Sequence, residues 1–168
     1  MTELRPATPA DVDLLAQQNS PEGAGMHSWW GYRSAAAIAA RVSAADSIGE
    51  EQGMLAVVDE GGAVVGDVSW VRLGNGPPPQ GYCYNIGVWI AAQHRGRGHG
   101  AEAQRQLAAY LFEHFYLERV EASTEIDNVG EQRALDKAGF TREGVLRHAW
   151  FRGGAWRDIV LYSKLRGE

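Results

Sequence analysis

Apolar and polar positions follow two different rhythms along the chain, and these separate strands from helices. The clearest strand signal is the apolar run at residues 86–90, which ends a segment beginning at Tyr82 and is typical of a buried strand. From residue 101 to residue 115, apolar side chains recur every three or four positions, so we expect a helix that packs one face on a sheet. A polar segment rich in glycine, residues 93–100, connects the two.

The same criteria divide the rest of the chain. Further strands are expected at residues 4–7, 54–58, 63–73, 119–124, 140–147 and 156–165, and further helices at residues 8–19, 34–45 and 127–138. Thr8 followed by Pro9 is typical of a helix start, and Gly139 just after Lys137 is typical of a helix end. A hairpin turn is expected at residues 59–62 and a long exposed loop at residues 74–79.

This order of elements predicts an α+β (mixed α/β) fold in which helices cover a central sheet. A chain of 168 residues is long enough for a substantial core, so a single domain spanning residues 1–168 is the expected organisation. Neither an internal repeat nor a low-complexity tract interrupts it.

Charge and composition narrow the classes of function. The net charge of -5 argues against nucleic acid as a main partner and mildly favours cationic substrates such as amines. The single cysteine, Cys83, excludes an internal disulfide framework and fits a reducing, cytoplasmic location. No apolar run reaches the length of a membrane span, and the first residues lack a signal sequence, so no membrane partner is expected. No Cys/His spacing typical of zinc is present, so we expect no metal.

The glycine-rich segment has the character of an anion site. Gly96, Gly98 and Gly100 remove side chains where a ligand would approach the backbone, and the helix that follows presents unpaired N–H groups. Arg95, Arg97 and His99 add positive or polar groups. The spacing fits neither the P-loop nor the dinucleotide fingerprint, and an ordinary glycine-rich turn is the alternative at this point.

Aromatic residues stand out in the loop at residues 21–31, which is otherwise small and polar. Trp29 and Trp30 are adjacent there. They either plug one end of the core or line a ligand pocket, because pockets are commonly walled by aromatic side chains.

Residues 95–100, Arg-Gly-Arg-Gly-His-Gly, match the R/Q-x-x-G-x-G/A motif, and the chain thereby resembles the GNAT acetyltransferase superfamily. Asn128, eleven residues before Gly139, stands where that family has a conserved asparagine. Residues 139–147 and 154–163 resemble the RimJ/RimL-like branch. The resemblance covers essentially the whole chain in element order, and it is closest from about residue 85 onward.

The resemblance implies a GNAT-like fold with a mostly antiparallel sheet of about six to seven strands, a splayed and bulged central strand, and about four helices. It implies acetyl-CoA as co-substrate. The backbone of Val88 and Ile90 is expected to pair with the pantetheine arm, with the Val88 amide as oxyanion donor and Asn128 near the acetyl end. The residues expected around the CoA phosphates are Arg95, Gly96, Arg97, Gly98, His99, Gly100, Ala101 and Arg133, and Lys137 is weighed there against an ordinary solvated position.

The proton-transfer residues do not follow from the resemblance. Leu135 stands where many members have a tyrosine acid, Glu131 where the branch often has serine, and Asn85 where it often has glutamate. Glu131 is the catalytic candidate, as an acid or a water-mediated base if burial raises its pKa; the alternative is a capping box with Asn128. His27 and His148 are further candidates, and catalysis by positioning alone is also open.

The expected activity is transfer of an acetyl group from acetyl-CoA to a primary amine by direct attack in a ternary complex. The acceptor is a small metabolite or antibiotic, or a protein N-terminus, and a homodimer is possible. The expected acceptor residues are Trp29, Trp30, Tyr84, Asn85, Trp150 and Asp158, since aromatic faces and a carboxylate suit an ammonium group. Two alternatives remain: a CoA-binding regulatory module without turnover, and transfer of another acyl group such as succinyl.

Overall fold

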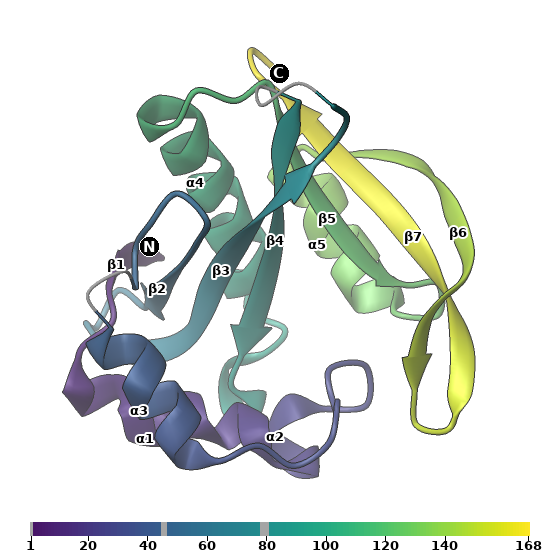
Figure 1. The fold of residues 1–168 in the computed structure, drawn as a ribbon. Coiled ribbons are helices and arrows are strands. Elements are labelled where there is room, and N and C mark those ends of the chain that lie inside the picture. Colours follow the sequence, from purple (N-terminus) through teal and green to yellow (C-terminus); the bar gives the residue numbers. More distant parts are fainter. Residues whose placement is uncertain (1, 45–46, 78–80) are drawn as a thin grey trace.

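The computed structural model describes residues 2–44, 47–77 and 81–168. It contains one seven-stranded sheet with helices on both faces (Figure 1). Ala45, the last residue of a predicted helix, and Pro78 and Pro79 of the predicted loop lie outside the described residues.

The sheet has the strand order β1-β2-β3-β4-β5-β7-β6. Its strands are β1 (Glu3–Pro6), β2 (Gln52–Val58), β3 (Val64–Gly74), β4 (Tyr82–Ile90), β5 (Arg119–Glu125), β6 (Thr141–Arg152) and β7 (Ala155–Leu165). Among these strands only β4 and β5 pair in parallel; the other pairs are antiparallel. The α+β fold and the mostly antiparallel sheet expected from the sequence are therefore confirmed.

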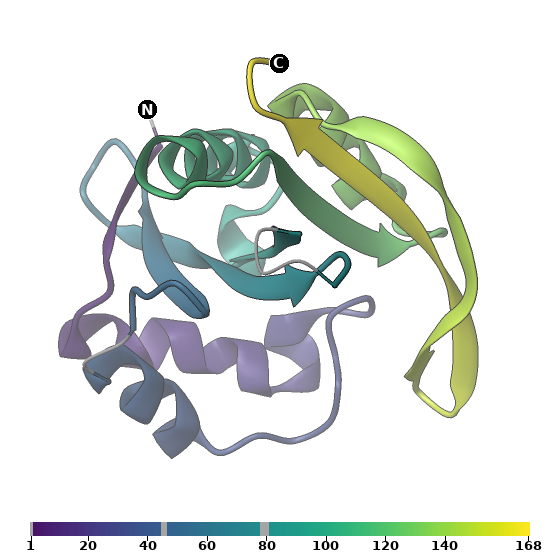
Figure 2. The ribbon, with the colours of Figure 1, turned by 45° about the horizontal axis from the view of Figure 1, so that its top comes forward.

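Helices pack on the two faces of the sheet (Figures 1 and 2). The described α-helices are α1 (Val12–Leu15), α2 (Pro21–Ala24), α3 (Ala35–Ser43), α4 (His99–His114) and α5 (Val129–Ala138), with 3-10 turns at Pro9–Asp11, Ala16–Asn19 and Ala92–His94. Helices α4 and α5 cover one face, and α1 to α3 cover the other (Figure 2). Among the described residues, no helix has both the length and the apolar content needed to cross a bilayer.

Each face has its own apolar core. Leu107 and Leu111 of α4 pack with Leu135 of α5 against the sheet, as the three- and four-residue spacing predicts. On the other face, Leu15 and Ile38 pack around Trp89. Alternate residues of β4 thus serve two cores, because successive side chains of a strand point to opposite faces.

Strands β4 and β5 separate part of the way along the sheet. They are paired from Tyr84 to Ile86, and beyond Ile86 the edge of β4 that faces β5 has no strand partner among the described residues. The splay expected of the central strand is therefore present. The expected bulge is not: the register of β4 with β3 runs without a shift from Tyr82 to Ile90. The two strands therefore separate where their pairing ends at Ile86, without a bulge in β4.

Most element boundaries shift by a few residues from the sequence prediction, and three differences are larger. The helix expected at residues 8–19 is a series of short 3-10 and α turns, and residues 21–24 of the expected loop form α2. Ser20 caps α2 by accepting the Gly23 N–H, and Pro21 suits the first helical position. Strand β6 continues to Arg152, across an irregularity between Leu146 and Trp150.

Candidate active site

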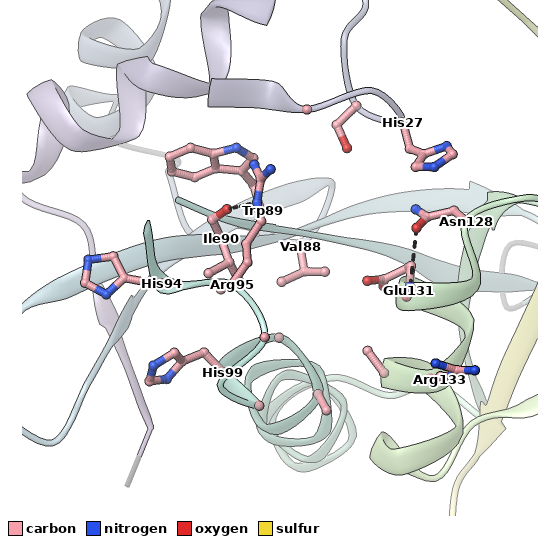
Figure 3. Close-up of a pocket in the computed structure, with 18 of the residues that line it drawn as sticks. His27, Val88, Trp89, Ile90, His94, Arg95, His99, Asn128, Glu131 and Arg133 are labelled. Atoms are coloured by element: carbon pink, nitrogen blue, oxygen red, sulfur yellow. Dashed lines mark hydrogen bonds between the residues drawn. The ribbon is translucent and has the colours of Figure 1, made fainter. Parts of the chain in front are cut away.

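A pocket of about 490 Å³ lies where β4 and β5 separate (Figure 3). The end of β4, the glycine-rich loop with the start of α4, the start of α5, and the segment after α2 enclose it. Its lining residues are Ala24, Gly25, Met26, His27, Ser28, Val88, Trp89, Ile90, His94, Arg95, Gly96, Gly98, His99, Gly100, Ala101, Asn128, Gly130, Glu131, Arg133, Ala134 and Lys137. Most of the residues predicted to bind CoA are in this set.

Two glycines with positive φ shape the glycine-rich loop. Gly96 and Gly98 have φ values of 74° and 89°, which side chains other than glycine rarely adopt. A Cβ added at either position would meet no atom within 4 Å, so both open onto free space. Gly98 is the N-cap of α4, which begins at His99 rather than at Ala101. The N-terminal end of α4, with its unpaired N–H groups, therefore lies at the pocket.

The free edge of β4 presents two residues to the pocket. The Ala91 N–H donates to the Val65 carbonyl at 2.9 Å. Because bonded and non-bonded pairs alternate along an antiparallel ladder, the backbone groups of Val88 and Ile90 point away from β3. They point to the side that β5 has left, where a ligand chain can take the place of a strand.

The Arg95 side chain is turned back onto the protein. Its Nε donates to the Ile90 carbonyl at 2.7 Å, and its guanidinium donates to the Gly23 carbonyl at 2.6 Å. Trp89 Nε1 donates to the same Gly23 oxygen at 2.9 Å. Arg95 therefore lines the pocket and fixes α2 to the end of β4. Because the Ile90 carbonyl accepts this hydrogen bond, only the Ile90 N–H is left, among the described residues, to pair with a ligand.

Asn128 links β5 to α5 at the narrow end of the pocket. Its side-chain amide donates to Thr124 Oγ1 at 2.9 Å, and its side-chain oxygen accepts the Glu131 N–H at 3.4 Å. Asn128 is therefore the N-cap of α5, as predicted. The reciprocal half of the capping box is absent, because the Asn128 N–H donates to the Glu125 carbonyl at 2.9 Å.

The Glu131 carboxyl is free of the cap and lies in the pocket (Figure 3). Burial raises its pKa from 4.5 to about 7, and the Gln104 amide offsets part of that rise. A carboxyl that titrates near neutral pH in a cavity is suited to proton transfer. The geometry thus favours the functional interpretation of Glu131 over the capping one.

Other pocket residues were either missed by the sequence reasoning or named there without a place in the pocket. The segment 24–28 forms a wall that only the three-dimensional arrangement reveals, and His27 lies there across from Asn128 (Figure 3). His94 Nδ1 is buried without a hydrogen-bond partner among the described residues. Lys137 lines the pocket rather than only facing solvent. Arg97, expected at the phosphates, is exposed and outside the lining set.

Two of the expected acceptor residues, Tyr84 and Asp158, make contacts that stabilise the fold. Tyr84 is 1% exposed, packs in the core, and donates its hydroxyl to the Glu50 carbonyl at 2.7 Å; its assignment to an acceptor pocket was wrong. Asp158 accepts the backbone N–H of His148 at 2.8 Å. His148 has a φ of 49° and lies in the irregular part of β6, so Asp158 holds the bend in that strand.

A second cavity of about 450 Å³ is lined by two of the other acceptor candidates, Asn85 and Trp150. It is lined by Arg41, Gln52, Ser69, Trp70, Val71, Asn85, Ile86, Gly87, Ser123 and Trp150. Trp30 packs edge-on against Trp150 with ring centroids 5.2 Å apart, whereas Trp29 packs against Tyr32. Asn85, Trp150 and Trp30 thus lie together, and Trp29 is outside the lining of both cavities.

Comparisons with known proteins agree with this geometry. The family model for acetyltransferase (GNAT) domains matches residues 2–141. The probable N-acetyltransferase YjcK of Bacillus subtilis (strain 168) is 35% identical over 83 residues, which are 49% of this chain and 46% of YjcK. The ribosomal-protein-serine acetyltransferase of Escherichia coli (strain K12) is 26% identical over 102 residues, 61% of this chain and 55% of that protein. The chain thus spans about half the length of the curated relatives it matches.

Among solved structures, spermidine N-acetyltransferase from Vibrio cholerae, in complex with CoA and spermine, has a TM-score of 0.78 to this chain. The match covers 98% of this chain and 95% of that one at 17% identity. At this identity the likeness is one of fold.

Proposed function

Since the chain belongs to the GNAT acetyltransferase domain family, as the loop and Asn128 led us to expect, we propose that it is an N-acetyltransferase. In this proposal an acetyl group passes from acetyl-CoA to a primary amine by direct attack in a ternary complex. The observation that carries the proposal is that the glycine loop, the free β4 edge and Glu131 all line the same pocket.

The donor half of the reaction uses the loop and the β4 edge. The N–H groups at the start of α4 bind the pyrophosphate of CoA, because unpaired amides and the helix dipole favour an anion there. His99, Arg133 and Lys137 lie around the same pocket and supply further donors. The pantetheine arm pairs with Val88 and Ile90 in place of β5, and the V. cholerae neighbour of the same fold carries CoA.

The reacting carbonyl lies beside Val88 in this arrangement. The Val88 N–H donates to the oxygen as negative charge develops in the transition state. Glu131, with its pKa near 7, is protonated in part of the molecules at neutral pH and donates a proton to the departing thiolate. Glu131 thus takes the acid role that a tyrosine has in many family members. Leu135, which stands at that position and is fully buried, has no proton to donate.

The acceptor amine enters through the cavity that holds Asn85 and Trp150, on the other face of the splayed strands. Aromatic faces stabilise an ammonium group, and the net charge of -5 favours a cation. Small amines and protein N-termini both meet this description. One structural neighbour acts on spermidine and one relative on a ribosomal protein.

Release of the CoA thiol from acetyl-CoA with a panel of amines tests the proposal, with CoA affinity measured by calorimetry. Thiol release with at least one amine, dependent on that amine, supports it. Tight CoA binding without release with any amine would instead favour a regulatory module that binds CoA without turnover. Competition between acetyl-CoA and succinyl-CoA decides which acyl group is used.

A further inference from the structure

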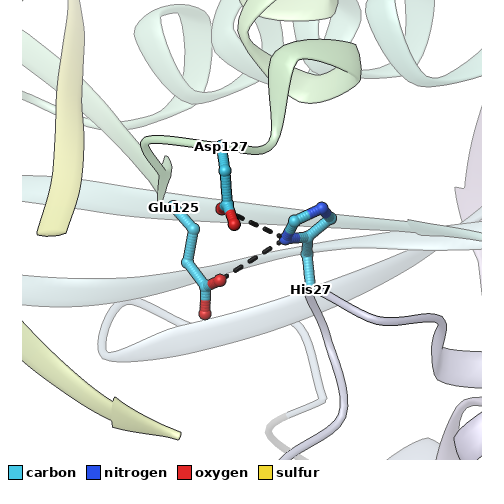
Figure 4. Close-up of side chains that lie close together, drawn as sticks. All are labelled: His27, Glu125 and Asp127. Atoms are coloured by element: carbon cyan, nitrogen blue, oxygen red, sulfur yellow. Dashed lines mark hydrogen bonds and ion pairs between the residues drawn. The ribbon is translucent and has the colours of Figure 1, made fainter. Parts of the chain in front are cut away.

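His27 and two carboxylates form a cluster at the edge of the pocket that the proposed function does not use (Figure 4). His27 Nδ1 lies 3.4 Å from Glu125 Oε2 and 3.5 Å from Asp127 Oδ1. The residues come from two distant parts of the chain: His27 from the segment after α2, and Glu125 and Asp127 from the end of β5 and the turn that follows it. The fold therefore brings an imidazole to the point where β5 leaves β4.

Arg152 decides what this cluster can bind. It donates to both carboxylate oxygens of Glu125, one of them at 2.6 Å, and Glu125 is only 1% exposed. The Arg152 hydrogen bonds lower the pKa of Glu125, so that carboxylate stays ionised. Because the arginine already neutralises Glu125, the cluster is poorly suited to a metal ion and well suited to holding an imidazole.

The orientation of the ring leaves one nitrogen available. With Nδ1–H directed to the carboxylates, Nε2 is the unprotonated nitrogen of a neutral imidazole. Nε2 lies on the opposite side of the ring (Figure 4) and has no hydrogen-bond partner among the described residues. His27 also lines the pocket, across from Asn128 and Glu131 (Figure 3).

We propose that His27 accepts the proton of the attacking amine, with Glu125 as the positioning residue that orients its ring. This inference rests on the proposed acetyl transfer and assigns the step that Glu131 does not perform. His27 and Glu131 lie on opposite walls of the pocket, so an acid and a base flank the place where the thioester would lie.

The step balances with these two groups. The neutral amine nitrogen forms a bond to the thioester carbon and passes one proton to His27 Nε2. The carbon–sulfur bond breaks, and the CoA thiolate takes one proton from the Glu131 carboxyl. Proton exchange with solvent then returns His27 to the neutral form and Glu131 to the acid form, and the products are the N-acetyl amine and CoA.

The test compares His27→Ala with His114→Asn, an exposed histidine at the end of α4 that is outside the lining of both cavities. We expect His27→Ala to lower kcat by about 10²-fold or more, to leave the Kd of CoA within about twofold, and to regain activity with added imidazole. The control keeps wild-type kcat. A loss of less than threefold, or a loss confined to CoA affinity, would overturn the proposal.

The pH profile provides a second readout, measured with a weakly basic amine that is neutral throughout. The charged groups around the ring are Glu125 on β5, Asp127 in the following turn, Arg152 on β6 and Glu131 on α5. In the wild type, kcat/KM falls at acid pH, because a base catalyst must be unprotonated to accept the proton of the amine. His27→Ala removes that fall, and Glu125→Gln lowers kcat because the ring loses the acceptor that orients it.

The two proposals fail in different ways. If the wild type transfers acetyl to an amine and His27→Ala keeps both its rate and the acid limb, only the assignment of His27 is wrong. If the wild type binds CoA but acetylates no amine, the proposed function and this inference are both wrong. Circular dichroism of each variant separates a folding defect from a catalytic one, and imidazole rescue cannot arise from misfolding.

Discussion

The backbone N–H of Glu131 donates to the Asn128 side-chain oxygen at 3.4 Å, but the Glu131 carboxyl does not return a hydrogen bond to the Asn128 backbone. The residue therefore contributes its backbone to the helix cap and its side chain to the pocket. The Asn128 side chain caps α5 without the Glu131 carboxyl. That carboxyl lines the pocket, where the proposed proton transfer uses it.

Glu131→Gln is expected to lower kcat by about 10²-fold, the usual contribution of one acid catalyst. As an acid with a pKa of about 7, Glu131 must be protonated, so wild-type kcat falls as pH rises through 7. The variant lacks that fall. Asp136→Asn, on the exposed side of the same helix, is the control. Equal kcat for Glu131→Gln and wild type at every pH would show that the carboxyl is structural.

The same carboxyl affects the stability of the unliganded protein. Its folded pKa is raised from 4.5 to about 7, so its favourable contribution is complete below pH 4.5 and is lost as pH rises through 7. We expect Glu131→Gln to be more stable than wild type by about 3 kcal/mol at pH 8 and equal to it at pH 4. Urea unfolding at the two pH values measures this; a difference independent of pH would contradict it.

Gly98→Ala tests the loop as the phosphate site. At φ 89° the alanine costs about 1 kcal/mol of stability, and its methyl group enters the space assigned to the pyrophosphate. We expect the Kd of CoA to rise at least tenfold. Gly62→Ala is the matched control, since Gly62 has a φ of 82° with equal free space but lies in the hairpin turn after β2. It should lose similar stability and bind CoA normally. Equal CoA affinity in the two variants would show that the loop is not the phosphate site.

Arg95→Ala removes the hydrogen bonds that join Gly23 to Ile90. We expect a loss of about 2 kcal/mol, as for hydrogen bonds from a charged group, and weaker CoA binding because the segment after α2 loses its anchor. Arg97→Ala, two residues away and exposed, should change stability by less than about 0.5 kcal/mol. Thermal unfolding and calorimetry compare the two, and equal stabilities would refute the anchoring role.

Trp150→Ala tests the second cavity as the acceptor site. Loss of an aromatic wall is expected to raise the KM for the amine about tenfold without changing the Kd of CoA. Trp156→Ala is the control, because Trp156 is 59% exposed and, although it pairs beside Trp150 in the same hairpin, it packs against Phe151 and is outside the lining of the second cavity. An unchanged KM for the amine in Trp150→Ala would show that the second cavity is not the acceptor site.

The sequence predicted the parts of this structure that depend on local signals. Hydrophobic spacing located β4 and α4, and the cluster of glycines located the turn between them, whereas the positive φ values of Gly96 and Gly98 came from the structure. Tyr84 was misplaced because an aromatic residue on a strand faces either a pocket or the core, and only the packing of α4 decides which. His27 and Glu125 lie 98 residues apart, so no pattern along the chain brings them together.

The measurement that tests the central claim most directly is mass spectrometry of a reaction containing the protein, acetyl-CoA and an amine panel that includes polyamines and N-terminal peptides. The account predicts an amine heavier by one acetyl group, in an amount equal to the CoA thiol released, with the wild type and with Gly62→Ala but at much lower rates with Gly98→Ala and Glu131→Gln. Thiol release without an acetylated amine, or equal rates in all four proteins, would contradict it.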